Sequence, residues 1–294
     1  MNGLLIIDKP EGMTSTEVVR VVKRRLHCKT GHLGTLDPFA SGVLPLCVGE
    51  GTKIAQFLNS ADKEYTGVIR LGRETDTGDP TGTTTATAAI PWLNADLLAA
   101  TAARLSGDTL QVPPMYSAIK RQGIPLYKLA REGLTVDREP RPVRIDALQL
   151  TDIGDGGIAF RVACSKGTYV RVLAQQVAGE LGSVGYLESL RRTRFGHFRV
   201  EDAVQLSEIE DPSVPLIGLR DALPHLREIV IDAATARRTR HGYEPALAGL
   251  EPGASSEAAK LIAPNGHLAA VIVMDRGGRW RFARVIESGN EAAS

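Results

Sequence analysis

The chain has 294 residues, 43% of them hydrophobic and 23% charged, and this length suits one large domain followed by a small one. Its net charge is +1, so bulk charge alone indicates neither a nucleic-acid-binding nor an acid-seeking protein. No apolar run approaches the roughly 18–20 residues of a membrane span, and the N-terminal MNGLLIIDKPEG lacks the features of a secretory signal.

The first half of the chain is predicted to alternate short strands and helices. Thr14 and Glu17 have the spacing of a capping box, and apolar residues recur every fourth position from Val18, which predicts a helix over 15–26. Strands are expected at 4–8 and 63–72, a loop at 75–82, and helices at 94–105 and 126–132. The segment 111–120 is expected to begin with irregular structure, because its first residues are rich in proline.

The second half begins with the same alternation and then changes in character near residue 226. Strands are expected at 143–150, 158–164 and 191–200, with a helix at 168–181. Beyond residue 226, short strands are predicted at 228–232, 260–263, 268–275 and 279–286, with a basic helix at 234–242. This pattern predicts a small, mostly β module over 226–290 and a disordered tail at 291–294.

One short stretch, GHLGTLDPFASGVLPL (31–46), holds a single carboxylate among glycines, prolines and apolar side chains. Because Pro38 follows it, the backbone of Asp37 is expected outside the helical region. Asp37 either caps a short helix with Pro38 in its first turn or is an ionised carboxylate at the mouth of a cleft. The second alternative requires a cation from elsewhere in the chain, since a buried carboxylate otherwise becomes protonated.

Charge is unevenly distributed along the chain. Five cations and no acid lie between Glu17 and Asp37, and RRTRFGHFR (191–199) has four arginines and no acid. Such segments either form a basic face for a polyanion or are solvated surfaces. His27, Cys28 and His32 have poor spacing for a metal site, so no metal is predicted. The three cysteines, odd in number and scattered, favour reduced thiols in the cytoplasm.

Six ordered segments span residues 4 to about 196, roughly two-thirds of the chain: LLIIDKPEGMTS, GHLGTLDPFASGVLP, EYTGVIRLGRETDTGD, VPPMYSAIKRQGIPLYKLAREG, CSKGTYVRVLA and LRRTRFG. Together they resemble the TruB family of tRNA pseudouridine-55 synthases. One departure is Leu33, where the family usually has a small or hydroxyl residue in the G-H-x-G loop.

The resemblance implies roles for individual residues. Asp37 would be the catalytic aspartate, and Arg171 would be its ion-pair partner and the cation that the carboxylate requires. Tyr65 would stack on the target base, and Tyr169 and Leu190 would line the uracil pocket. His32 would fill the space that the extruded base leaves. Lys9 and Lys166 would position phosphates or brace loops. Read from local sequence alone, Arg171 could equally be a surface arginine, and the pocket residues could be core residues.

The resemblance also implies a fold and a reaction. It implies an α/β (α+β) catalytic domain over 1–225, with a central mixed, largely antiparallel sheet flanked by helices, and a PUA-like RNA-binding domain over 226–290. The reaction would isomerise a uridine of the tRNA T loop, at position 55, by base flipping and aspartate-dependent cleavage. No metal, nucleotide or other cofactor is expected, and the protein is expected to be a cytoplasmic monomer.

Two other functions remain open from the sequence. One is a non-catalytic protein on the same scaffold that binds or folds tRNA. The other is a related synthase that acts on other RNAs.

Overall fold

The computed structural model describes residues 1–59, 61–210, 214 and 216–287. Its largest sheet has ten strands within these residues. Eight of them lie in the order β14 (Val204–Gln205), β1 (Gly3–Lys9), β3 (Ser41–Val48), β12 (Gly185–Phe195), β4 (Lys63–Leu71), β11 (Gly157–Cys164), β10 (Arg141–Gly154) and β7 (Gly107–Gln111), while β2 (Thr30–His32) pairs with β3 and β13 (Phe198–Arg199) pairs with β12.

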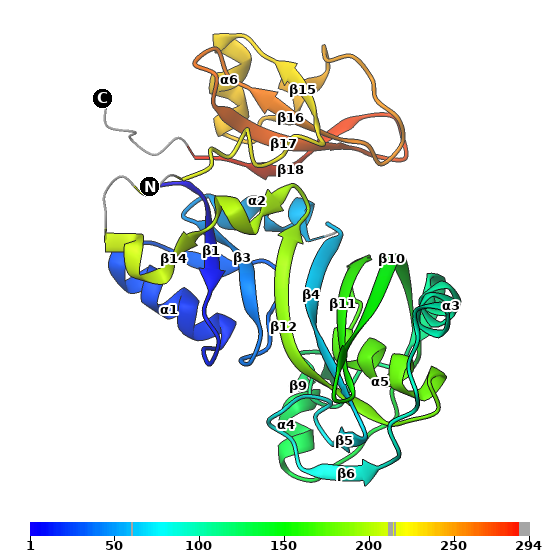
Figure 1. Ribbon diagram of the computed structural model, residues 1–294. Coiled ribbons are helices and arrows are strands. Elements are labelled where there is room, and N and C mark those ends of the chain that lie inside the picture. Colours follow the sequence, from blue (N-terminus) through cyan, green and yellow to red (C-terminus); the bar gives the residue numbers. More distant parts are fainter. Residues whose placement is uncertain (60, 211–213, 215, 288–294) are drawn as a thin grey trace.

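This sheet is mixed and largely antiparallel. β1 pairs in parallel with β14 and β3 pairs in parallel with β12, whereas the remaining neighbours are antiparallel. Figure 1 shows β12, β4, β11 and β10 side by side as long strands through the middle of the molecule. The predicted fold class is therefore confirmed.

Helices and short elements complete this part of the chain. The helices are α1 (Ser15–Leu26), α2 (Gly51–Leu58), α3 (Ala95–Leu105), α4 (Leu126–Arg131), α5 (Val170–Glu180), η1 (Val200–Asp202) and η2 (Leu206–Glu210), and the short strands are β5 (Arg73–Thr75), β6 (Thr84–Thr87), β8 (Lys120–Arg121) and β9 (Ile124–Pro125). None of the described helices is both long enough and apolar enough to cross a bilayer.

The main core lies between the sheet and helices α3 and α5, which pack on β10 and β12. Leu173 and Val177 project from α5 into a cluster with Ile69 and Ile158 from the strands. This packing fixes the start of α5 relative to β4 and β12, and so determines where the side chains of its first turn point.

α1 forms as its local sequence predicts. The Thr14 side chain accepts a hydrogen bond from the Glu17 backbone N–H, and the Glu17 carboxylate accepts one from the Thr14 backbone. These two bonds satisfy backbone groups at the helix start. Val18 and Val22 are buried against β1 and β3, which leaves the basic residues of α1 on its outer side.

The C-terminal part has a separate four-stranded sheet, seen at the top of Figure 1. Its strands are β15 (Arg227–Val230), β16 (Ala258–Ile262), β17 (Leu268–Met274) and β18 (Trp280–Val285), accompanied by α6 (Ala233–Arg240) and η3 (Glu244–Leu247). Ile262 and Val271 share an apolar cluster with Leu4 and Ile54, so the two sheets pack together near α2. The exact domain limits stay a prediction, and the predicted tail at 291–294 lies outside the described residues.

Two local expectations were wrong. The alternative in which Asp37 caps a helix is excluded, because residues 38–39 form a turn and β3 begins at Ser41. Strand β3 itself was not predicted, because all of its residues are buried and the sequence lacks the alternation of a half-exposed strand. β12 begins at Gly185 and not at residue 191, and it ends at Phe195.

Gly42 explains why the strand β3 can lie so close to β12. It has a φ of +103°, and a Cβ atom there would lie 2.2 Å from the backbone oxygen of Arg192. Only glycine fits this contact. The contact holds the segment that carries Asp37, residues 33–40 (the Asp37 loop), against the centre of the sheet.

Candidate active site

Asp37 and Arg171 form a two-pronged ion pair between the Asp37 loop and the first turn of α5. Arg171 Nε donates to Asp37 Oδ2 at 2.9 Å, and Nη2 donates to Oδ1 at 3.2 Å. The Arg171 side chain is 5% exposed and that of Asp37 is 33% exposed. Arg171 is therefore not a surface arginine, and the cation required by the carboxylate is present. Solvent, and hence a substrate, can reach the carboxylate but not its partner.

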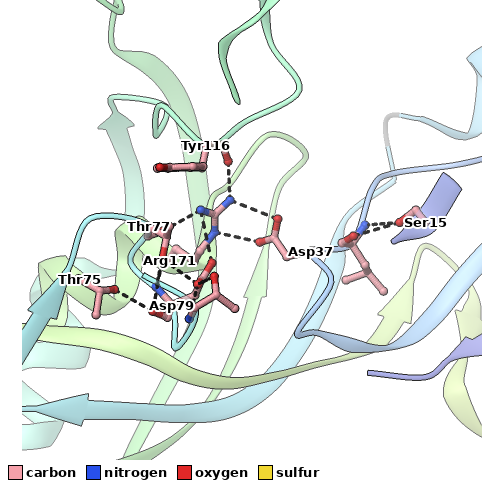
Figure 2. A network of polar contacts seen from close by, with 9 residues as sticks. Ser15, Asp37, Thr75, Thr77, Asp79, Tyr116 and Arg171 are labelled. Atoms are coloured by element: carbon pink, nitrogen blue, oxygen red, sulfur yellow. Dashed lines mark hydrogen bonds and ion pairs between the residues drawn. The ribbon is translucent and has the colours of Figure 1, made fainter. Parts of the chain in front are cut away.

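The Arg171 guanidinium also joins two other loops, as Figure 2 shows. It donates from Nη1 to the backbone oxygen of Thr77 at 2.8 Å and from Nη2 to that of Tyr116 at 2.7 Å. The second carboxylate at the site is Asp79, whose Oδ2 lies 3.9 Å from Nη1. One buried cation thus serves two carboxylates and ties three segments of the chain together.

Asp79 is a residue to which sequence reasoning assigned no role. Its Oδ1 accepts hydrogen bonds from the Thr77 hydroxyl at 2.7 Å, the Thr81 hydroxyl at 2.6 Å and the Thr81 backbone at 3.0 Å. Its side chain is 9% exposed, so it supports Arg171 and is not available as a second acid or base at the surface. The only signal in the sequence was its place in the TDTGD segment.

Burial dominates the electrostatics of Asp37. Burial raises the pKa of the Asp37 carboxyl, the Arg171 guanidinium opposes this rise, and the Asp79 carboxylate adds to it. A carboxylate that is only partly solvated is a better base and nucleophile than one in water. The paired guanidinium favours its ionised form.

The Asp37 loop is held on both sides of the aspartate. The Ser15 hydroxyl accepts a hydrogen bond from the Leu36 backbone N–H at 2.9 Å and donates to the Leu36 oxygen at 3.0 Å. The Pro38 oxygen accepts from the Gly12 backbone at 2.8 Å. The start of α1 therefore positions the residues that flank Asp37, and Figure 2 shows Ser15 on this side of the site.

Lys9 completes this bracing from within the protein. Its ammonium donates to the backbone oxygens of Pro10 at 2.7 Å, Met13 at 2.6 Å and Pro38 at 3.3 Å. The residue is fully buried. Of the two roles expected for Lys9, these contacts are those of loop bracing. Burial lowers the pKa of Lys9 to about 8, although the Asp37 carboxylate opposes the effect.

Replacing Lys9 by methionine is expected to lower the free energy of unfolding at pH 7 by about 1–3 kcal/mol, because buried carbonyls lose their donor. The loss should grow with pH. Between about pH 8 and 10.5 the unfolded chain holds the lysine proton and the folded protein does not, so raising the pH stabilises the wild type.

Urea unfolding of both proteins between pH 7 and 10.5 measures this difference. Lys23→Met, on the exposed outer side of α1, is the control and should follow the wild type across the range. A gap between the wild type and Lys9→Met that stays constant or shrinks above pH 8 would contradict the assignment.

Tyr65 and Leu190 lie in the core beneath the site. Both belong to the apolar cluster that also contains Leu36 of the Asp37 loop. Tyr65 is 8% exposed and Leu190 5%, which agrees with their reading as core residues and leaves their implied contacts with a base as predictions. Burial raises the pKa of the Tyr65 hydroxyl.

The remaining predicted site residues lie around this centre. Tyr169 directly precedes α5, its backbone N–H donates to Gln111 Oε1 at 3.0 Å, and burial raises the pKa of its hydroxyl. His32 ends β2, and its Nδ1 is buried without a hydrogen-bond partner among the described residues. Burial lowers the pKa of His32. Lys166 lies exposed in the turn before α5.

The cations of the two basic segments differ in exposure. On α1, Arg20, Lys23 and Arg24 are exposed. In the 191–199 segment, Arg191 forms a 2.7 Å ion pair with Asp8 and Arg192 is buried. The α1 surface is therefore the better candidate for contact with a polyanion. No group of three or more His, Cys, Asp or Glu side chains within the described ranges is arranged to hold a metal ion.

Comparison with known proteins shows the family of this chain. The family model described as TruB family pseudouridylate synthase (N terminal domain) matches residues 20–170. A tRNA pseudouridine synthase B from Hydrogenovibrio crunogenus is 43% identical over 84% of this chain and 82% of its own length. Another protein of that name, from Aromatoleum aromaticum, is 48% identical over 80% of this chain and 78% of its own length.

Solved structures extend the similarity to the whole fold. The structure of an H/ACA RNP bound to a substrate RNA containing 2'-deoxyuridine contains a chain that superposes with a TM-score of 0.70 at 24% identity, covering 98% of this chain and 86% of that one. A Cbf5-Nop10-Gar1 complex gives a TM-score of 0.69 at 24% identity, covering 97% and 84%. At this identity the similarity concerns the fold alone.

Proposed function

The chain belongs to the TruB family of pseudouridylate synthases, and on this basis we propose that it isomerises a uridine of tRNA to pseudouridine, at position 55 in the T loop. The observation that carries the proposal is the Asp37–Arg171 ion pair, in which a partly exposed carboxylate is held by a buried guanidinium. Its relatives from two bacteria carry the name tRNA pseudouridine synthase B, which supports tRNA as the substrate.

The target base must leave its stack to reach Asp37. Flipping costs a few kcal/mol, and less in a loop than in a duplex. Stacking on Tyr65 returns about 1–3 kcal/mol in this proposal. Asp37 then acts at the sugar–base junction, as a nucleophile or by assisting cleavage of the glycosidic bond. The uracil turns in the pocket and rejoins the ribose through carbon 5, whose proton leaves by way of Tyr65.

The surrounding residues have supporting roles in this proposal. Leu190 and Tyr169 line the uracil pocket, and His32 fills the space that the extruded base leaves in the RNA loop. Lys166 and the exposed cations of α1 contact phosphates of the T arm, which fix the register of the RNA without reading its sequence. Lys9 contributes by bracing the Asp37 loop.

The reaction exchanges one carbon–nitrogen bond for one carbon–carbon bond within the same nucleotide. It transfers no electrons, phosphoryl group or water, so the proposal includes no cofactor and no metal. We place the enzyme in the cytoplasm, where tRNA is processed, and propose that it acts as a monomer.

The direct test is to incubate unmodified tRNA with the purified protein in EDTA and without cofactor, and then to map pseudouridine by chemical labelling and mass spectrometry. We expect conversion approaching one pseudouridine per tRNA, at position 55 only. A tRNA with cytidine at position 55 is the matched control and should remain unlabelled.

Other outcomes would support the alternatives. Binding of tRNA without any conversion would favour a protein that only binds or folds tRNA. Conversion that requires an added guide RNA would favour a synthase acting on other RNAs.

A further inference from the structure

Arg192 is a second buried arginine next to the active site, and the mechanism above does not use it. It lies on β12 and is 1% exposed. Its Nε donates to the Val43 backbone oxygen at 2.7 Å, and its Nη2 donates to the Gly34 oxygen at 3.0 Å. The guanidinium also lies 5.3 Å from the centre of the Phe195 ring. These contacts fix its position from three sides.

The fourth neighbour of Arg192 is Tyr65. The two residues are directly opposite each other in the antiparallel pairing of β12 with β4, so their side chains project from the same face of the sheet. Both side chains are buried, and the Arg192 guanidinium lowers the pKa of the Tyr65 hydroxyl. A rigidly held cation therefore faces the phenol that is proposed to meet the target base.

The charge of Arg192 is unusual for its surroundings. Arg171 is buried beside two carboxylates, whereas no carboxylate within the described residues forms an ion pair with Arg192. Its acceptors are two backbone carbonyls, and the side chain opposite it on β4 is a phenol. Burial of a cation among neutral acceptors is costly, and here burial lowers the pKa of Arg192. Such an arrangement would stabilise negative charge formed on a neighbouring atom.

We propose that Arg192 is a positioning residue for Tyr65: it orients the hydroxyl oxygen and stabilises negative charge on it during loss of the proton from carbon 5 of the target base. The inference rests on the proposed function. In that step the carbon 5–hydrogen bond breaks and its electron pair forms the double bond between carbons 5 and 6. The electron pair of the carbon 6–nitrogen 1 double bond moves to nitrogen 1, which takes a proton from water. The proton from carbon 5 binds to the Tyr65 phenolate, whose own proton had gone to water, and Arg192 keeps its protons throughout.

The groups that face Tyr65 set the direction of the expected effect. They are Arg192 from β12, Cys164 from β11 and Asp37 from its loop. Burial raises the pKa of Tyr65, Arg192 lowers it, and Cys164 and Asp37 raise it further. The Cys164 thiol is neutral over most of the range, since burial raises its pKa to about 11. Loss of the Arg192 charge should therefore make Tyr65 harder to ionise.

The experiment titrates Tyr65 by fluorine NMR, with 3-fluorotyrosine incorporated at that position in otherwise full-length protein without RNA. In R192M the titration midpoint is expected to rise by about 1–3 pH units. In R192K, which keeps the charge without the planar fork, it should stay closer to the wild type. If R192M does not fold, R192Q serves as the neutral variant with the same expected direction.

Single-turnover rates of pseudouridine formation are measured against pH in the same set. The pH at which the rate rises should shift upward together with the Tyr65 titration midpoint. In R192M this shift corresponds to a rate roughly 10- to 1000-fold lower at a fixed pH. The control is I69V, a mild core substitution further along β4 in the same apolar cluster, which should change neither the titration nor the pH profile.

An unchanged Tyr65 titration in R192M, or a rate that falls equally at every pH, would overturn the role of Arg192 while leaving the proposed function intact. A wild-type protein that forms no pseudouridine would instead overturn the proposed function, and with it the catalytic part of this inference. The titration without RNA separates these two failures.

Discussion

The variant Asp37→Asn is expected to form pseudouridine on the order of 10⁴-fold more slowly than the wild type, or not at all. Asparagine cannot act as a nucleophile or base at the sugar–base junction. Its side-chain oxygen can still accept one hydrogen bond from Arg171, and Asp79 still faces the guanidinium. The fold and the binding of T-arm RNA should therefore be retained.

Two measurements on the same preparation check this expectation. Binding of tRNA is measured by filter retention, and conversion is measured by chemical labelling and mass spectrometry. Asp8→Asn is the matched control, since Asp8 is also an aspartate paired with an arginine, Arg191, at 2.7 Å but lies outside the Asp37–Arg171 network. Conversion by Asp37→Asn within tenfold of the wild type would exclude Asp37 as the catalytic group.

Asp37→Asn is also expected to change how stability depends on pH. Because burial raises the pKa of Asp37, the folded protein holds this proton more tightly than the unfolded chain does. Ionisation of Asp37 therefore opposes folding, and the wild type loses stability as the pH rises from about 4, the unfolded value, through the folded pKa. Asp37→Asn lacks this loss, so its stability relative to the wild type should improve over that interval.

The variant Arg171→Met is expected to be the most destabilising of those proposed, by about 3–5 kcal/mol. It leaves Asp37 and Asp79 together without their cation and leaves the Thr77 and Tyr116 oxygens without a donor. The removed guanidinium also held Asp37 in place, so activity should be lost as well. Urea unfolding at pH 7 measures the change.

Two further variants make this prediction specific. Arg104→Met breaks an arginine–carboxylate contact of 2.7 Å in which both side chains are more than one-third exposed, so it should cost at most about 1 kcal/mol. Adding Asp79→Asn to Arg171→Met should recover part of the lost stability, because it removes one of the two unpaired carboxylates. Equal costs for Arg171→Met and Arg104→Met would contradict a buried network.

Local sequence determined much of this protein. The capping box at Thr14 and Glu17 specified the start of α1, and Pro38 kept Asp37 out of a helix. The strands expected at 143–150 and 158–164 also formed, as parts of β10 and β11. Each of these features depends on residues within a few positions of one another, so their cause is contained in the stretch where they are seen.

Tertiary structure alone decided what surrounds Asp37. The family resemblance predicted that Arg171 pairs with Asp37. In contrast, the contacts of Asp79, Lys9 and Arg192 formed only when β1, β3, β4, β12 and α5 came together. Strand β3 was not predicted because it is buried on both faces, so apolar and polar residues do not alternate along it. The charge state of a buried group depends on neighbours that lie far away in the chain, and folding alone determines which groups those are.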